Sequence, residues 1–168
     1  MLRHLILVNY ATVTLMVCLL LFIISNSYFE KQIRRLFLLA CLLVLCLVIV
    51  DSVEYWTATF DHATSLRIWM SAIGYSIRPA NIFIVILLLL RQRKKKLVWL
   101  SIPLYINALL GFSALFTDIA YFYSADNQFV RGPLGYFAFV TSGFYAVVLL
   151  ICTIKQYKEV NLSEYAAV

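Results

Sequence analysis

The chain has 168 residues, of which 64% are hydrophobic and only 13% are charged, and its mean hydropathy is +0.91. A soluble domain of this length is about half apolar, so the composition excludes an ordinary soluble domain and predicts an integral membrane protein. The net charge of +6 does not indicate nucleic-acid binding, because most of the basic residues lie in short loops between apolar runs, as in membrane proteins.

Apolar runs long enough to cross a bilayer follow one another along the chain, since a crossing helix needs about 20 residues. We therefore expect a single transmembrane domain, residues 1–168, built as an all-α helix bundle of about five spans. In chain order the expected spans are residues 5–24, 36–56, 68–90, 97–116 and 133–151. Residues 156–168 turn apolar again toward their end, which indicates a cytoplasmic tail or the start of a further span.

Basic residues mark one side of this bundle. Lys31, Arg34 and Arg35 lie between the first and second runs, and residues 91–96 carry five basic side chains between the third and fourth. The loops on the other side have little positive excess. Because positively charged loops stay in the cytoplasm, we expect the N-terminus outside and the C-terminus inside.

Arg78 lies about midway through the run 68–90, where a charge costs roughly 2.5–3.5 kcal/mol on insertion scales. Pro79 follows it, and because proline has no N–H, the carbonyl of Tyr75 loses its helical donor, which predicts a hinge. Polar or small residues recur in this run at spacings of three and four, at Ser71, Gly74, Tyr75, Arg78 and Asn81. They share one helix face, which must contact protein or water because lipid cannot satisfy it.

The second run supplies counter-charges for Arg78. Asp51 and Glu54 are one helical turn apart, so both can face the same neighbouring helix. Counted at 1.5 Å per residue from the cytoplasmic edge, Asp51 and Arg78 differ in depth by roughly 5 Å, which an arginine side chain covers. We therefore expect Asp51 to lie within reach of Arg78.

The fourth run carries a stripe of small and polar residues suited to close helix packing. Its members are Pro103, Asn107, Gly111, Ala114 and Asp118. We expect Asp118 to lie near the outer mouth of the bundle.

Three interpretations of this polar centre stay open: an Arg–Asp pair that only fixes helix register, a ligand or signal site open to the outer side, and an ion or proton path. The candidate residues for ligand binding or a polar relay are Arg78, Asn81, Tyr75, Asp51, Glu54, Asn107 and Asp118, with Pro79 as hinge. No catalytic base, nucleophile or metal-ligand spacing accompanies the acids. We therefore expect no enzymatic activity in this chain, no metal and no cofactor.

The outer loops are rich in aromatic rings, at Phe60, Trp69, Tyr121, Phe122, Tyr123 and Phe129. Such rings form a belt at the membrane interface in many membrane proteins. The alternative is an apolar lid over a ligand pocket.

Two short stretches resemble the seven-helix N-terminal sensor regions of bacterial diguanylate cyclases (GGDEF proteins) and sensor histidine kinases. They are Gly74-Tyr75-Ser76-Ile77-Arg78-Pro79 and Arg131-Gly132-Pro133-Leu134-Gly135-Tyr136. The resemblance implies a homodimeric sensor of the bacterial inner membrane. Such a sensor would detect a small ligand from the outer side or the membrane and relay it to a cytoplasmic output domain.

The chain departs from that family pattern in one respect. The pattern implies two more spans and an output domain, whereas the sequence holds neither a GGDEF motif nor a kinase phospho-acceptor region. We therefore expect a truncated sensor whose partners are the lipid bilayer, a second copy and an unknown small ligand, and not nucleic acid. The alternatives are a small transporter, or part of one, and a structural helix bundle.

Overall fold

The computed structural model describes residues 2–26, 28–90 and 94–165 of the chain. These residues form five helices and one hairpin, with the bounds α1 Leu2–Ser25, α2 Lys31–Thr57, α3 Ser65–Leu89, α4 Lys94–Ser113, β1 Tyr121–Tyr123, β2 Phe129–Arg131 and α5 Phe137–Tyr165. The predicted all-α class is confirmed, because each expected apolar run lies largely within a helix.

Within the described residues, three helices are long and apolar enough to cross a membrane: α2, α3 and the part of α5 from Phe137 to Tyr157. α1 and α4 contribute the shorter apolar segments Asn9–Ser25 and Val98–Ser113. The number of crossings and their orientation stay predictions. Residues 91–93, which carry part of the basic loop used to infer the orientation, lie outside the described residues.

The end of the chain differs in its bounds from the expected span 133–151. α5 begins at Phe137, after turns at residues 132–136, and continues without a break to Tyr165. Residues of the expected tail therefore extend the same helix as far as Tyr165.

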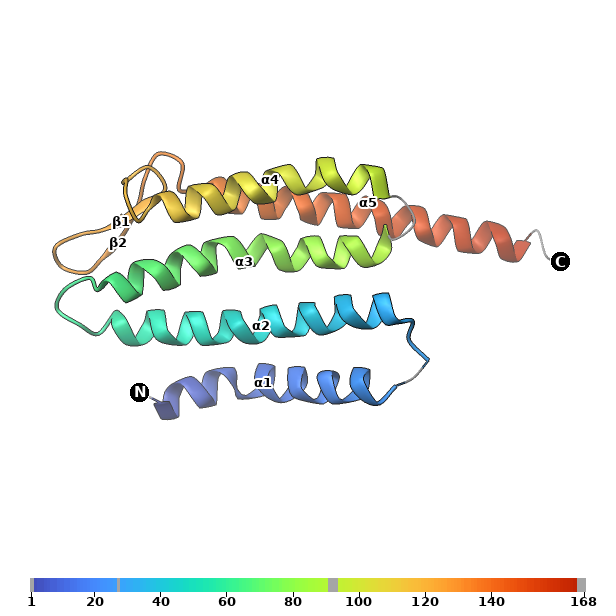
Figure 1. The fold of residues 1–168 in the computed structure, drawn as a ribbon, viewed down its shortest axis with the longest axis horizontal. Coiled ribbons are helices and arrows are strands. Elements are labelled where there is room, and N and C mark those ends of the chain that lie inside the picture. The colour runs from blue at the N-terminus through green and yellow to red at the C-terminus, as the bar shows by residue number, and fades with distance from the viewer. Residues whose placement is uncertain (1, 27, 91–93, 166–168) are drawn as a thin grey trace.

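α3 is the centre of the bundle. It packs against α2 on one side and against α4 and α5 on the other, while α1 packs against α2. The N-terminus and the hairpin lie at one end of the molecule, and α5 runs past the other helices at the opposite end (Figure 1). The most buried face belongs to α3, where Ser71, Gly74, Tyr75 and Pro79 are all buried. The prediction that the polar stripe of this helix faces protein is thus confirmed for Ser71, Gly74 and Tyr75, whereas Arg78 is half-exposed and Asn81 is half-buried.

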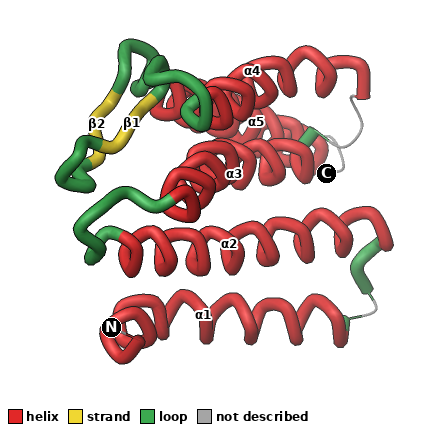
Figure 2. Tube along the Cα trace, turned by 60° about the vertical axis from the view of Figure 1, so that its left-hand side comes forward, coloured by secondary structure: helices red, strands yellow, loops and turns green. Residues whose placement is uncertain are grey.

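Residues between α4 and α5 form the antiparallel hairpin β1–β2, which was not predicted (Figure 2). Tyr121 pairs with Arg131 and Tyr123 with Phe129. The connection turns at Asn127, whose φ of 57° lies in the left-handed region that asparagine tolerates. Aromatic and branched residues on both sides of an Asp-Asn turn are the signal that was overlooked.

Two apolar clusters among the described residues give the bundle its core. At the end opposite the hairpin, Phe83 and Ile86 of α3 pack on Tyr145 of α5. Near the hairpin, Tyr75 packs with Tyr121 and Ala138. Many apolar side chains on the outer faces are exposed instead, as expected for surfaces that contact lipid.

α4 approaches α3 closely because Gly111 lies at their contact. A Cβ atom on this glycine would lie 3.1 Å from Cδ1 of Tyr75 and 3.3 Å from the carbonyl oxygen of Ala72. Asn107, one turn earlier, is fully buried at the same contact. The predicted stripe therefore packs against α3 at Asn107 and Gly111, whereas its members Ala114 and Asp118 lie beyond the end of α4. Asn107 is placed to bond the backbone of α3.

Candidate functional site

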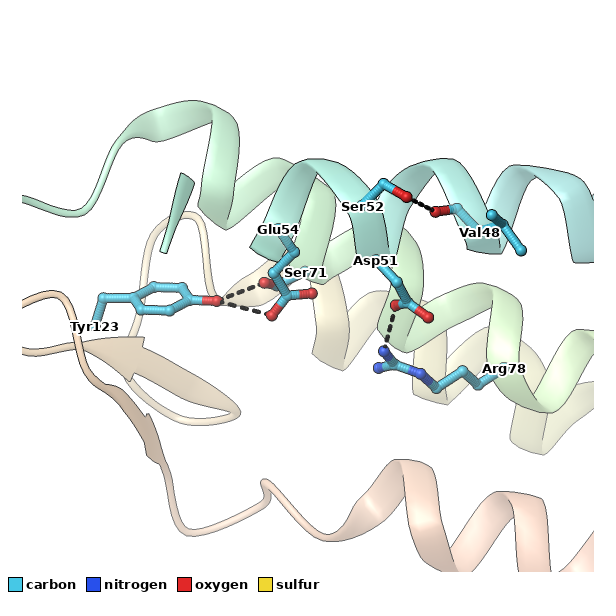
Figure 3. Close-up of polar contacts among 7 residues, drawn as sticks. All are labelled: Val48, Asp51, Ser52, Glu54, Ser71, Arg78 and Tyr123. Atoms are coloured by element: carbon cyan, nitrogen blue, oxygen red, sulfur yellow. Dashed lines mark hydrogen bonds and ion pairs between the residues drawn. The ribbon is translucent and has the colours of Figure 1, made fainter. Parts of the chain in front are cut away.

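Arg78 and Asp51 form the predicted ion pair between α3 and α2 (Figure 3). Nη2 of Arg78 lies 2.8 Å from Oδ1 of Asp51, and the two side chains are 49% and 46% exposed. Among the contacts of the described residues, this is the one hydrogen bond that the Arg78 guanidinium makes. Since a guanidinium has five N–H donors, most of those of Arg78 are free for another acceptor.

Glu54 does not bond Arg78 but faces the hairpin. Its Oε1 lies 3.3 Å from the hydroxyl of Tyr123, which also lies 2.5 Å from Oγ of Ser71 (Figure 3). Burial raises the pKa of Tyr123 to about 12, so its hydroxyl keeps its proton at neutral pH. Tyr123 therefore connects the hairpin to both α2 and α3 through one hydroxyl group.

A second arginine, Arg67 near the start of α3, holds the hairpin in place. It is only 8% exposed, and Nη1 donates to both the backbone oxygen and the side-chain Oδ1 of Asn127. Its guanidinium also lies 4.4 Å from the ring centre of Tyr123. Asn127 in turn donates from Nδ2 to the backbone oxygens of Thr57, at 3.1 Å, and Phe60, at 2.8 Å. We call Arg67, Tyr123 and Asn127 the hairpin clasp.

Tyr75 is bonded at both its backbone and its side chain. Its carbonyl, which Pro79 deprives of a helical donor, accepts a hydrogen bond of 2.9 Å from Nδ2 of Asn107. Its hydroxyl donates to the carbonyl of Gly135 at 3.0 Å and accepts from the backbone N–H of Ala138 at 3.2 Å. The predicted loss of a donor is thus confirmed, and the two stretches that carry the sensor resemblance touch each other.

These groups border a cleft of about 420 Å³, the main cleft, between the end of α2, α3, the hairpin and α5. Its lining residues are Glu54, Ser71, Tyr75, Arg78, Tyr121, Phe129, Arg131, Gly135, Ala138, Phe139 and Ser142. A side cleft of about 310 Å³ is lined by Asp51, Glu54, Tyr55, Ala58, Arg67 and Arg78. The two clefts share Glu54 and Arg78, which therefore lie between them, whereas Asp51 lines the side cleft alone.

Aromatic rings make most of the hairpin side of the main cleft. Tyr121 and Phe129 stack with ring centres 5.3 Å apart, and Phe139 of α5 also lines the cleft. The guanidinium of Arg131 lies 5.2 Å from the ring centre of Tyr136 and 5.3 Å from that of Phe139. For Tyr121 and Phe129 this position favours the lid alternative over an interfacial belt.

The structure brings together only part of the predicted site. Asp51, Glu54, Tyr75 and Arg78 line one or both clefts. Of the other predicted residues, Asn107 is buried between α3 and α4, Asp118 is exposed in the loop after α4, and Asn81 is half-buried, and none of the three lines these clefts. The hinge residue Pro79 is buried inside α3, directly after Arg78.

Sequence reasoning did not name Arg67, Asn127 or Arg131 as site residues, although Arg131 opens one of the two stretches that carry the sensor resemblance. Arg67 lies four residues before Ser71, so the polar stripe of α3 extends to it at the same helical spacing. That spacing was available in the sequence. The position of Asn127 was not, because its partner in the clasp lies 60 residues away along the chain.

The fold and the clefts identify a broad class: an all-α protein with helices long and apolar enough to cross a membrane. No family model, no curated protein and no solved structure matches the chain. Within the described residues, no group of three or more His, Cys, Asp and Glu side chains is placed to hold a metal ion. The resemblance to bacterial sensor regions therefore stays a prediction.

Proposed function

We propose that this chain is a membrane-embedded signal-input domain, which binds a small ligand in the main cleft. It would relay binding to a cytoplasmic output domain of the diguanylate cyclase or histidine kinase type that lies outside this sequence. The observation that carries the proposal is the state of Arg78. It is a half-exposed cation with unused donors in a cleft of about 420 Å³, a volume within the range of small-molecule sites.

The relay is supported by the helices that line the cleft. α5 contributes Ala138, Phe139 and Ser142 to the cleft wall and continues past the other helices at the opposite end of the bundle (Figure 1). α3 contributes Arg78 beside Pro79. A ligand that bridges α3 and α5 shifts their packing if it binds one arrangement better than the other.

The membrane setting of the proposal is a five-span homodimer in a bacterial inner membrane, with the N-terminus outside. The exposed apolar side chains on the outer helix faces support burial in lipid. The positions of the N- and C-termini at opposite ends of the bundle agree with an odd number of crossings (Figure 1).

The test begins with the chain purified in lipid nanodiscs and exposed to a broad panel of small metabolites. A ligand held at 100 times its Kd raises the free energy of unfolding by about 2.7 kcal/mol, which a thermal shift detects. We expect the shift to vanish in Arg78→Gln and to persist in Gly143→Ala, a variant in which the added methyl meets open space. Hydrogen exchange along residues 137–157 should change with ligand in the wild type. A panel with no binding compound would contradict the proposal.

A transporter is the second candidate, because the two clefts meet at Glu54 and Arg78. Ionisable side chains inside a membrane bundle often mark substrate or ion paths. Flux of a bound compound into proteoliposomes favours this alternative, whereas binding without flux favours the signal-input domain.

A further inference from the structure

Charges of both signs surround the main cleft. Among the described side chains, Glu54, Arg78 and Arg131 line the cleft, and Asp51 bonds Arg78 from the side cleft, which Arg67 also lines. Because an uncompensated charge is costly beside aromatic walls, a ligand that carries both signs suits this cleft better than a lone anion or cation, which would lie near a charge of its own sign.

The hydrogen-bonding capacity of these charged groups is only partly used. Arg78 bonds one carboxylate oxygen of Asp51, and the carboxylate of Glu54 has one hydrogen bond, at 3.3 Å, from the hydroxyl of Tyr123. The cleft thus offers free cationic donors on α3 and a free anionic acceptor on α2. A ligand that carries both a negative and a positive group satisfies the two at once.

The acidic groups lie on adjacent turns of α2, and Arg78 lies on the neighbouring helix α3. Asp51 lies 2.8 Å from Arg78, and Glu54 follows one helical turn later, where neighbouring Cβ atoms on a helix face are about 5–6 Å apart. Both Glu54 and Arg78 line the same two clefts. The ligand's opposite charges must therefore be separated by a few bonds rather than by a long chain.

The rest of the cleft is apolar. Tyr121, Phe129 and Phe139 contribute rings from the hairpin and α5, and Ala138 contributes a small side chain between them. Ring walls favour an aromatic or large aliphatic body, with edge-to-face or offset contacts. A cleft of about 420 Å³ holds a ligand of that size together with water.

From these observations we propose that the ligand of the main cleft is an α-amino acid with a large apolar side chain, above all an aromatic one. This inference rests on the proposed function and names its ligand class. The carboxylate binds the free N–H groups of Arg78, the ammonium group binds the carboxylate of Glu54, and the side chain lies among Tyr121, Phe129 and Phe139. Asp51 pairs with the Arg78 guanidinium from the side cleft. Arg131 lies beside the rings of Tyr136 and Phe139 and also lines the main cleft.

The experiment compares four probes on the chain in nanodiscs by isothermal titration: L-phenylalanine, 2-phenylethylamine, which lacks the carboxylate, 3-phenylpropionate, which lacks the ammonium group, and L-alanine, which lacks the ring. We expect phenylalanine to bind at least tenfold more tightly than either analogue. We expect L-alanine to bind more weakly than phenylalanine by a similar factor, because it leaves the ring walls empty.

Two variants test which side chain binds each charged group of the ligand. In Arg78→Gln, phenylalanine should lose its advantage over 2-phenylethylamine, and in Glu54→Gln it should lose its advantage over 3-phenylpropionate. Arg35→Gln is the matched control, because Arg35 is exposed at the opposite end of α2 and lines neither cleft; this variant should keep both advantages. Circular dichroism of the unliganded variants checks their folding, and the four probes on the wild type decide the ligand class even if a variant fails to fold.

The outcomes separate this inference from the proposed function. If either analogue binds the wild type as tightly as phenylalanine, or if a compound of another class binds through Arg78, the amino-acid ligand is wrong while a ligand-binding domain stands. If neither these probes nor any compound of the broad panel binds, both proposals fall together.

Discussion

The two arginines of α3 stand in opposite surroundings. Arg67 is 8% exposed, and its partners are the two oxygens of Asn127 and the ring of Tyr123. Arg78, about three turns further along, pairs with the carboxylate of Asp51 while its side chain stays 49% exposed. An ion pair therefore does not by itself mark an arginine as structural, because the more firmly held arginine is the one without a carboxylate partner.

The comparison separates two regions of the molecule. Around Arg67 the hairpin clasp is closed, and its hydrogen bonds fasten residues 121–131 to the ends of α2 and α3. Around Arg78 the clefts are open, and donors and acceptors remain free. Substitutions in the clasp should therefore change stability, whereas substitutions at Arg78 should change binding.

The largest effect is expected from Arg67→Met. The substitution removes the guanidinium that bonds Asn127 and leaves buried acceptors unpaired, which should lower the free energy of unfolding by about 3 kcal/mol. Thermal unfolding in detergent gives the total, and hydrogen exchange of residues 121–131 locates the loss. Arg131→Met, on the exposed face of the same hairpin, is the control and should change stability little. If both variants lose the same free energy of unfolding, the hairpin clasp does not contribute more to stability than the residues around the cleft.

The next effect is expected at Gly132, where the chain leaves the hairpin. A Cβ atom there would overlap the backbone oxygens of Asp118 and Ile119, and backbone atoms cannot rotate away as a side chain does. Gly132→Ala should therefore destabilise the protein by about 2 kcal/mol. In the control, Gly143→Ala, the added methyl group meets nothing within 4 Å, and removal of a helical glycine should raise stability by roughly 0.5–1 kcal/mol. Thermal unfolding of both variants should therefore show a lower stability for Gly132→Ala and a higher stability for Gly143→Ala than for the wild type.

A smaller effect is expected from Asn107→Leu, which removes the donor to the carbonyl of Tyr75 and should cost about 1–2 kcal/mol. The same substitution should cost less in a Pro79→Ala background, because the restored N–H of residue 79 can bond that carbonyl within the helix. A double-mutant cycle measures the difference. If the two substitutions are additive, Asn107 does not act as the substitute donor.

The smallest effect on stability is expected from Asp51→Asn. A half-exposed ion pair contributes less than about 1 kcal/mol, so unfolding should change little, while the charge balance of the cleft shifts by one unit. Binding of 3-phenylpropionate should then rise relative to phenylalanine. A loss above about 2 kcal/mol, rescued by the exchanged pair Asp51→Arg with Arg78→Asp, would make Arg78 as structural as Arg67.

Sequence reasoning predicted the helices, one contact of the centre and one carbonyl that lacks a helical donor. Apolar runs of sufficient length place α1 to α5, and depth counting brings Asp51 to Arg78. The missing N–H of Pro79 identifies Tyr75 as a carbonyl without a helical donor. These features follow from periodicity and local chemistry, which the sequence contains directly.

The same reasoning did not predict the hairpin clasp or the walls of the clefts. Helical spacing shows which residues share a face, but not which helix the face meets, so Asn107 was placed in a packing stripe without its partner Tyr75. Residues 117–132 were treated as a loop between spans, which concealed the hairpin and with it the partner of Arg67. Contacts between segments this far apart depend on the tertiary packing.

Tyr75 has a consequence for how related chains are to be found. Its carbonyl requires Asn107 because of Pro79, and its hydroxyl requires the backbone turn at Gly135. These positions depend on one another, so they should change together when they change at all. Apolar spans match one another by composition alone, and a joint pattern at these positions is a more selective signature of ancestry than overall likeness along the helices.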